Sequence, residues 1–516
     1  MDNSRRSPYP QATSLLMNFR PRPRPLRFVS SLLTGFVQSL FPCAACSSTA
    51  IGGPSQALLE ASPYEHRQDQ VTVNSLPDDV LVEIFHFYVN CWPVRTNKWH
   101  TLVHVCQRWR HVVFASPNRL SLRLEYTGQR PISEMLDVWP VLPMVISQPP
   151  ALWEVCWRNV AVALESEHHH RICGIDLFNI PTLHWERLAP AMQKPFPGLT
   201  FLRISVAKNT ATSLPDSFLG GSTPLLRYLT LDNCPFPGLP KQLLSANQLV
   251  VLHLLNIPRS GCISPQDLVT ALSVMSRLET LLLKFRSPLY PASRPPPPLT
   301  RSVLPVLTRL EFRGVHEYLE DILAQIEVPL LNNLDVTFFI DIDFVIPQLY
   351  QLISQTESFK TCDRATVYTS DRGIRFTTSG TTNRLPELQL EISCRELDGQ
   401  LASLAQVCSS SFLLLSTFVQ LHITDGDPPP HWKDDMETTQ WLELLYPFTA
   451  VKDLVLSGRV APHVCQALEE VTGVLPALQN VFLCDLRSME SVPKYIMTFV
   501  AARELSGHPV AVHRRG

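Results

Sequence analysis

The stretch LLRYLTLDNC, Leu225 to Cys234, decides the fold of this 516-residue chain. Leu226, Leu229 and Leu231 form the string L-x-x-L-x-L, in which the last two leucines are separated by one residue. Alternating apolar residues place one face of a short strand against a core. A single strand of this length cannot bury that face alone, so the string predicts neighbouring strands of the same kind.

The string recurs along the chain when Ile, Val and Phe are allowed in place of Leu. The middle residues of the first seven copies are separated by 27, 27, 23, 29, 29 and 24 residues, and those of the last four by 33, 33 and 27. A period of about 20 to 29 residues is typical of leucine-rich repeats, so residues 172–516 resemble an irregular leucine-rich-repeat solenoid, or horseshoe. The eleven copies begin at Ile172, Leu199, Leu226, Leu249, Leu278, Leu307, Leu331, Leu385, Phe418, Val451 and Leu478.

Segments with helical periodicity lie between these strings, which predicts an α/β fold. One such helix is expected to start at Ser264-Pro265. The position three residues beyond the string is often Asn or Cys in such repeats, and of five positions compared only Cys234 conforms. An irregular insertion is expected at about residues 337–384, with a strand near Ala365–Val367 and a hairpin turn at Asp371–Gly373. The proline run Arg294–Pro298 is interpreted as a polyproline loop, an accommodated insertion rather than a ligand for a proline-reading domain.

Two amphipathic helices are expected in residues 71–120. The first is expected to begin with Pro77 as a first-turn proline, followed by acidic residues and by apolar residues recurring at helical spacing. The second is expected to run without a break from Trp99 to Pro117, with Arg108 pointing away from its apolar stripe. Two such helices cannot bury both apolar faces against each other alone. The apolar positions are Val80, Leu81, Ile84, Phe85 and Tyr88 in the first helix, and Leu102, Val105, Cys106, Trp109 and Val113 in the second.

The ordered set of motifs in this segment resembles an F-box. These motifs are Leu76-Pro77-Asp78-Asp79, Leu81-x-x-Ile84-Phe85 and Val105-Cys106-x-x-Trp109-Arg110. The connection from Asn90 to Lys98 is longer than is usual in that family. Together with the repeats, nearly everything after residue 70 is similar to F-box/leucine-rich-repeat proteins of mushroom-forming fungi.

The resemblance implies a non-catalytic subunit of an SCF-type cullin–RING ubiquitin ligase. Its F-box would bind a Skp-type adaptor, and through it a cullin scaffold, while the repeats would bind an unknown target protein. The resemblance places adaptor contacts at Leu76, Pro77, Val80, Leu81, Ile84 and Phe85, and the residues that shape the docking face at Leu102, Val105, Cys106 and Trp109.

A second interpretation is a structural scaffold protein in which the two helices only cap the first repeat. Exposure separates the two interpretations. As an F-box, the chain alone would expose Leu76, Pro77, Val80 and Ile84; as a cap, it would bury them against residues 120–180. In both interpretations residues 121–171 are expected to be a linker or capping segment.

Composition indicates a protein of a reducing compartment, the cytoplasm or the nucleus. A formal net charge of −2 disfavours nucleic acid as the main partner, and the thirteen cysteines are odd in number and scattered. Residues 1–70 are expected to be a poorly ordered tail with one amphipathic helix; Phe28–Ala50 is too polar for a membrane span, and a membrane or organelle address is the less favoured alternative.

No cofactor, metal or catalytic residue is expected. The pair Cys43 and Cys46 has no second ligand pair, and His168–His170 has no partner ligands at metal-site spacing. Asp341 and Asp343 have no phosphate-binding glycine loop beside them. Cys106 is expected to be an inert packing thiol on the apolar face of its helix.

Overall fold

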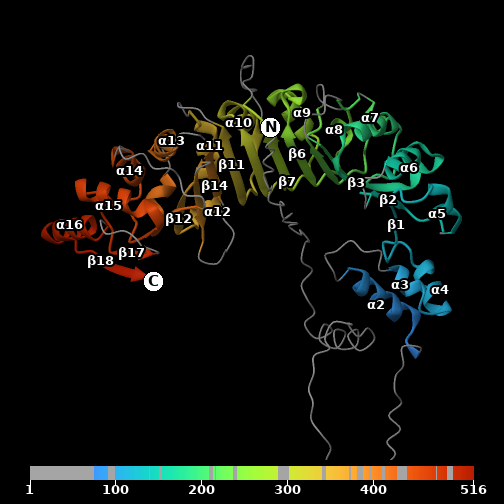
Figure 1. Cartoon of the computed structure of the whole chain (residues 1–516), viewed down its shortest axis with the longest axis horizontal. Helices are drawn as coiled ribbons and strands as arrows, with labels where there is room; N and C mark the ends of the chain where they lie inside the picture. The colour runs from blue at the N-terminus through green and yellow to red at the C-terminus, as the bar shows by residue number, and fades with distance from the viewer. Residues whose placement is uncertain are drawn as a thin grey trace, which may run out of the picture. The chain divides into compact units, whose positions relative to one another are not determined.

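The computed structural model divides into two compact units, one ending at Leu122 and one starting at Arg123 (Figure 1). Residues 1–74, with Cys43, Cys46 and Phe28–Ala50, lie outside the described part of the chain, as do Arg294–Pro298, Asp341 and Asp343. The structure describes residues 75–90, 99–138, 140–149, 154–207, 213–215, 217–235, 241–288, 301–339, 345–370, 373–380, 388–393, 397–409, 413–426, 438–471, 473–484 and 492–515.

The described part of the first unit contains three helices: α2 (Asp78–Asn90), α3 (Trp99–Val103) and α4 (Gln107–Ala115). Asp78 and Asp79 occupy the first turn of α2, where carboxylates stabilise the positive end of the helix dipole. One face of each helix contributes to a small core in which the Phe85 and Trp109 rings lie 4.7 Å apart between centroids. The buried apolar residues of these helices are Leu81, Val82, Phe85, Trp99, Leu102, Val103, Trp109, Val112 and Val113.

The expected single helix from Trp99 to Pro117 is wrong, because the chain breaks between α3 and α4. Cys106 has extended backbone angles, φ −157° and ψ 170°, and its thiol accepts a hydrogen bond from the Trp109 amide at 3.4 Å. It is therefore the N-cap of α4, a position where a side-chain acceptor satisfies an amide that the helix leaves unpaired. The break moves Val105 and Cys106 off the apolar stripe and onto the surface.

The second unit is built on one 16-stranded sheet, in which most neighbouring strands are parallel. The middle residue of every copy of the L-x-x-L-x-L string lies on a strand and is 2% exposed or less, so the strands expected from the string are confirmed. The eleven strands are β3 (Ile172–Ile180), β4 (Phe201–Val206), β5 (Tyr228–Asp232), β6 (Val251–Ile257), β7 (Thr280–Phe285), β9 (Arg309–Gly314), β11 (Asn333–Phe339), β14 (Leu388–Ser393), β15 (Gln420–Asp425), β16 (Asp453–Ser457) and β17 (Asn480–Cys484).

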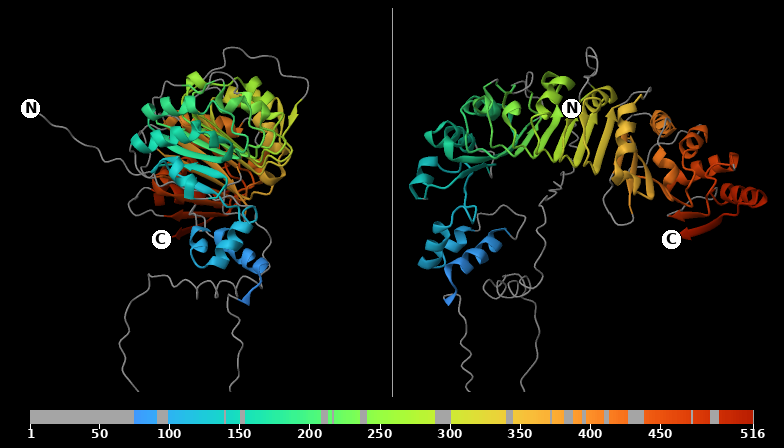
Figure 2. Two further views of the ribbon diagram at one scale, coloured as in Figure 1. Left: turned by 90° about the vertical axis from the view of Figure 1, so that its right-hand side faces the viewer. Right: turned by 180° about the vertical axis from the view of Figure 1, so that it is seen from behind.

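Helices follow most strands and lie along one side of the sheet (Figures 1 and 2). The expected helix start at Ser264 is confirmed, because its hydroxyl accepts the Asp267 amide at 3.1 Å and Pro265 occupies the first turn of α9. The helices are α5 (Ile132–Val138), α6 (Glu154–Glu165), α7 (Thr182–Ala191), α8 (Lys241–Ser245), α9 (Pro265–Leu272), α10 (His316–Leu323), α11 (Pro347–Gln355), α12 (Glu357–Lys360), α13 (Leu397–Ser409), α14 (Thr438–Leu445), α15 (Ala461–Glu470) and α16 (Val492–Leu505).

The sheet extends beyond the strings at both ends. Strands β1 (Leu124–Tyr126) and β2 (Met144–Ser147) pair in parallel with each other, and β2 pairs with β3. The segment 121–171, expected as a linker or cap, therefore supplies two strands and helices α5 and α6 to the array. At the other end β18 (Ala511–Arg515) pairs in parallel with β17.

The insertion before β14 is built into the sheet. The strand expected near Ala365–Val367 is β12 (Arg364–Ser370), and it forms an antiparallel hairpin with β13 (Gly373–Ser379); Asp371 and Arg372 themselves lie outside the described residues. The strand order is β11-β14-β13-β12-β15, so the chain crosses from β11 to β12 and returns through β13 to β14. β12 thereby supplies the parallel neighbour of β15, and β14 that of β11. A separate two-stranded sheet pairs β8 (Ser302–Val303) with β10 (Ile326–Glu327).

In the part of the chain that the structure describes, none of the helices combines the length and the apolar character needed to cross a membrane.

Candidate interaction surfaces

Helix α2 carries a second apolar face that is not part of the core. Val80, Ile84 and Phe87 follow each other at spacings of four and three residues, so they share one side of the helix. Val80 is 38% exposed and Phe87 39% exposed, while Ile84 is half-buried. We call these three residues the α2 stripe. Val80 and Ile84 were among the predicted contacts and Phe87 was not, although it lies three residues after Ile84 on the same side of the helix.

Arg108 of α4 holds the start of α2 in place. Its guanidinium donates hydrogen bonds to the Asp78 carboxylate, at 2.7 Å from Nη2 and 3.0 Å from Nε, and to the Leu76 carbonyl oxygen. A planar guanidinium suits such paired contacts. Arg108 thus positions Leu76 and the exposed Pro77 beside the α2 stripe. The helical pattern predicted only that Arg108 points away from the apolar positions.

The ten residues singled out in this unit fall into three groups by exposure. Pro77, Val80, Val105 and Cys106 are exposed; Leu76 and Ile84 are half-buried; Leu81, Phe85, Leu102 and Trp109 are buried. Leu81 and Phe85, expected at the adaptor, lie in the core of the unit. Val105 and Cys106, expected as framework, lie at the surface, and the expectation of a packed Cys106 thiol is wrong.

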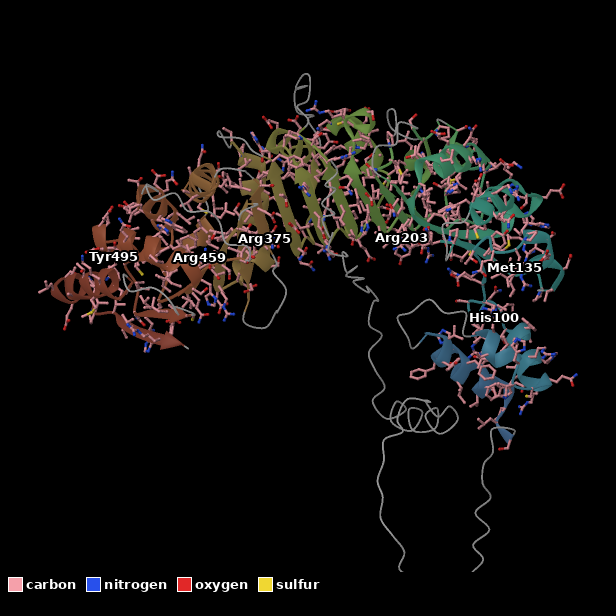
Figure 3. The ribbon with its side chains drawn as sticks, viewed as in Figure 1. His100, Met135, Arg203, Arg375, Arg459 and Tyr495 are labelled. Atoms are coloured by element: carbon pink, nitrogen blue, oxygen red, sulfur yellow. The ribbon has the colours of Figure 1, made fainter. Side chains whose placement is uncertain are left out.

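The second unit presents a polar face on the side of its sheet away from the helices. We call it the strand face; it consists of the strand residues that alternate with the buried apolar ones. Figure 3 labels Arg203 and Arg375 on this side. Arg203 donates to the Asp176 carboxylate at 2.6 Å, and Arg375 donates to the Glu391 carboxylate at 2.9 Å from Nε. Ion pairs between neighbouring strands therefore neutralise much of the charge on this face.

A denser charged cluster lies on β7, β9 and β11. Glu311 is buried and accepts Lys284 Nζ at 2.7 Å and Arg309 Nε at 2.7 Å. Burial alone would raise the pKa of Glu311, but the Lys284 ammonium and the Arg309 guanidinium outweigh it and hold that pKa below its ordinary value. Glu311 is therefore a fixed negative charge at neutral pH, shared by two cations.

The pKa values of two neighbours of this cluster, Asp335 and His253, are shifted in the direction that favours the neutral side chain. Burial, followed by the negative charge of Glu311, raises the pKa of Asp335 to about 6, and Gln389 Nε2 donates to Asp335 Oδ1 at 3.1 Å. Burial lowers the pKa of His253 to about 4, so its ring is neutral at pH 7.

We expect Asp335→Asn to stabilise the repeat array at neutral pH. The pKa of Asp335 is about 6 in the folded chain and about 3.9 in an unfolded one, so the folded state binds the proton more tightly and the unfolding free energy falls as pH rises between those values. The amide removes this penalty and can still accept from Gln389. After allowance for solvent screening, the gain should be about 1–2 kcal/mol at pH 7.5 and close to zero at pH 4.

Urea unfolding at the two pH values measures this gain. The matched control is Asp453→Asn, because the Asp453 carboxylate accepts Asn480 Nδ2 at 2.8 Å and Gln420 Nε2 at 3.3 Å on the same face. An equal gain at pH 4 and pH 7.5, or the same gain in the control, would show that the ionisation of Asp335 is not its source.

The ring nitrogens of His169 and His170 lie close to backbone carbonyl oxygens. His169 Nδ1 lies 2.9 Å from the Ser166 carbonyl oxygen and His170 Nδ1 lies 2.9 Å from the Glu167 carbonyl oxygen, within one short 3-10 helix. Across the described residues, no group of three or more His, Cys, Asp or Glu side chains is arranged to hold a metal ion.

No protein-family model matches this sequence, and no curated protein matches it. Among solved structures, the chain is similar to the leucine-rich repeat-containing protein LegL7 from Legionella pneumophila. That similarity has 15% sequence identity and a TM-score of 0.26, and it covers 75% of this chain and 98% of the other. The repeat architecture described above rests on the strand registers and buried residues of this chain itself.

Proposed function

We propose that this chain is a substrate-recognition subunit of an SCF-type ubiquitin ligase, acting in the cytoplasm or the nucleus. Its first unit would bind a Skp-type adaptor, and its repeat array would bind the target protein on the strand face. The observation that carries the proposal is the α2 stripe, an apolar helix face left exposed directly behind the Leu76-Pro77 motif.

Three features of the first unit support adaptor binding. A helix with an apolar face on each side is typical of an element that packs on its own core and on a partner. Arg108 fixes the entry to this helix, so the apolar surface is largely formed before any partner arrives, which reduces the ordering cost of binding. The aromatic Phe87 is of the residue class that is enriched at interface cores.

The competing interpretation, a cap for the repeats, requires burial of the same residues. On the first unit itself Pro77 and Val80 are exposed and Leu76 and Ile84 are half-buried, and residues up to Leu122 form a compact unit of their own. A separate unit with an apolar surface supports the adaptor interpretation. The described cysteines are all free thiols, which agrees with a reducing compartment.

The contribution of the chain to ubiquitin transfer would be proximity. A target held on the repeat array has its lysines at a high effective concentration near the conjugating enzyme, which converts an encounter between molecules into a reaction within one assembly. The covalent chemistry would belong to other subunits.

The test is affinity between the full chain and a purified Skp-type adaptor. We expect Val80→Glu/Phe87→Ser to weaken binding at least 100-fold, because truncating each central apolar contact costs about 2 kcal/mol or more. Glutamate near the start of a helix is compatible with its dipole, so the unit should stay folded, as far-ultraviolet circular dichroism can verify. The matched control is Val155→Glu, which changes an exposed valine (53%) on helix α6 of the repeat array.

Two results would contradict the proposal. One is wild-type protein that binds no adaptor offered; the other is a Val155→Glu variant that loses binding as fully as the double variant. In either case the first unit would be better explained as part of a scaffold protein.

A further inference from the structure

We propose that the cluster on β7, β9 and β11 binds an extended acidic segment of a partner protein, with one anionic group held between Arg313 and Lys284. The segment would belong to the target, so this inference rests on the proposed function and names the chemical class of its substrate. Four features of the cluster carry it.

The first feature is the register of the two cations. Lys284 on β7 and Arg313 on β9 are direct partners in the parallel pairing, so their Cα atoms lie about 4.8 Å apart and their side chains leave the same face of the sheet. Arg309 stands four residues before Arg313 on the same strand and the same face. Three cations thus share a patch two strands wide.

The second feature is the charge left over. Glu311 carries one negative charge and is paired with two cations, Lys284 and Arg309. One positive charge of these three side chains is therefore not neutralised. Asp335 adds one negative charge at neutral pH, His253 is neutral, and Glu391 is already paired with Arg375, so the three cations Lys284, Arg309 and Arg313 face two uncommitted carboxylates. Cations therefore exceed anions on this patch, although the chain as a whole has a formal net charge of −2.

The third feature is the state of Arg313. Its side chain is exposed, and among the described residues it makes no ion pair. Its guanidinium lies over the Phe339 ring, 5.3 Å from the centroid, which holds the planar fork in a defined orientation without using its hydrogen-bond donors. A guanidinium held in this way is prepared for two parallel hydrogen bonds to a carboxylate or a phosphate.

The fourth feature is the environment of the patch, which favours a peptide over a nucleic acid. Glu311 and Glu391 lie among the cations and would repel a continuous run of phosphates. Half-buried aromatic side chains on the same face, Phe339 on β11 and Tyr368 on β12, lie to one side of the Lys284–Arg313 pair and offer contact to apolar side chains of a segment that runs across the strands in that direction. Strands β7, β9 and β11 each have a neighbouring strand on both sides, so their backbone hydrogen bonds are already used. The peptide would therefore be held by side chains and not as an added strand of the sheet.

The experiment uses the full chain, immobilised, and three degenerate nonapeptide libraries. Their central residue is fixed as phosphoserine, glutamate or serine, and all other positions are randomised. We expect the wild type to retain the phosphoserine and glutamate libraries at least tenfold more than the serine library. A stronger signal from phosphoserine than from glutamate would identify the anion as phosphate; equal signals would identify it as a carboxylate.

Arg313→Gln should abolish this preference. Arg364→Gln is the matched control, because Arg364 is an exposed arginine on the same face whose Nε donates to Gln420 Oε1 at 3.1 Å, outside the cluster. Equal retention of the three libraries by the wild type, or equal losses in the two variants, would overturn the inference. Adaptor affinity should not change in Arg313→Gln, so failure here is distinguishable from failure of the proposed function.

Discussion

Replacing Trp109 with alanine is expected to unfold the first unit and leave the repeat array folded. Trp109 is 7% exposed and packs against Phe85 with ring centroids 4.7 Å apart and an angle of 57° between the rings. Removing a buried tryptophan side chain costs about 3–5 kcal/mol. A unit of this size has a small core, and its total stability is of the same order, so the loss should be enough to unfold it.

Hydrogen exchange read by mass spectrometry can follow both units in one sample. In Trp109→Ala, amides of α2 and α4 should exchange at the rate of an unfolded chain, while amides of the strands from β3 onward keep their protection. The control is Val105→Ala, a change at a 52% exposed position in the turn before α4, which should leave both units protected. Retained protection of α2 in Trp109→Ala would mean that this core is not what holds the unit together. Adaptor binding should disappear together with the protection of α2.

The strands of the repeat array were predictable because the string encodes a local physical requirement. Its middle residue must be buried in every repeat, and Leu229 on β5 and Leu281 on β7 are both 2% exposed or less. Strands β1 and β2 show the same alternation, in Leu124 and Tyr126 and in Met144 and Ile146, but they lack the full string. The full string therefore predicts a start of the array at Ile172, whereas the sheet begins two strands earlier, at Leu124.

A further signal was present in the asparagines that lie within one residue of the ends of several strands. Asn179, Asn233 and Asn256 have positive φ of 51°, 57° and 48°, a conformation that asparagine tolerates better than most residues. Asn233 Nδ2 donates to the carbonyl oxygens of Val206 and Ala207 in the preceding repeat, at 3.0 and 2.9 Å. The informative position of the repeat is therefore that of Asn233, one residue before the position of Cys234 that was compared between repeats.

Two features could not be derived from periodicity. The spacing of Leu102, Val105, Cys106 and Trp109 suits a continuous helix, and nothing in an apolar pattern reveals that the Cys106 thiol replaces a helical hydrogen bond. The order β11-β14-β13-β12-β15 depends on pairing between strands that are far apart in sequence. Such non-local contacts form only as the chain folds, so no local sequence pattern encodes them. The hairpin was predictable from its local pattern, and its neighbours in the sheet were not.

That strand order leads to the second large effect, expected for Phe376→Ala. Phe376 lies on β13, is 1% exposed, and has its ring centroid 6.2 Å from that of Phe418 and 6.4 Å from that of Phe448. These rings connect the inserted hairpin to the repeats that follow it. Truncating such a residue costs about 3–5 kcal/mol through lost contacts and the cavity left behind.

In a repeat array each repeat is stabilised mainly by its neighbouring repeats. A weakened contact between two repeats should therefore divide one cooperative unfolding transition into two. We expect hydrogen exchange at low denaturant to open β12, β13, β15 and β16 first in Phe376→Ala, with β4 to β7 still protected. The control is Phe482→Ala, at a half-buried ring on β17 that stacks on His513 with centroids 4.8 Å apart. Because that ring lies on the strand face and not between sheet and helices, its loss should leave β12 to β15 closed. Simultaneous opening of β4 and β15 in Phe376→Ala would mean that the array unfolds as one body and that the inserted hairpin is not its weak junction.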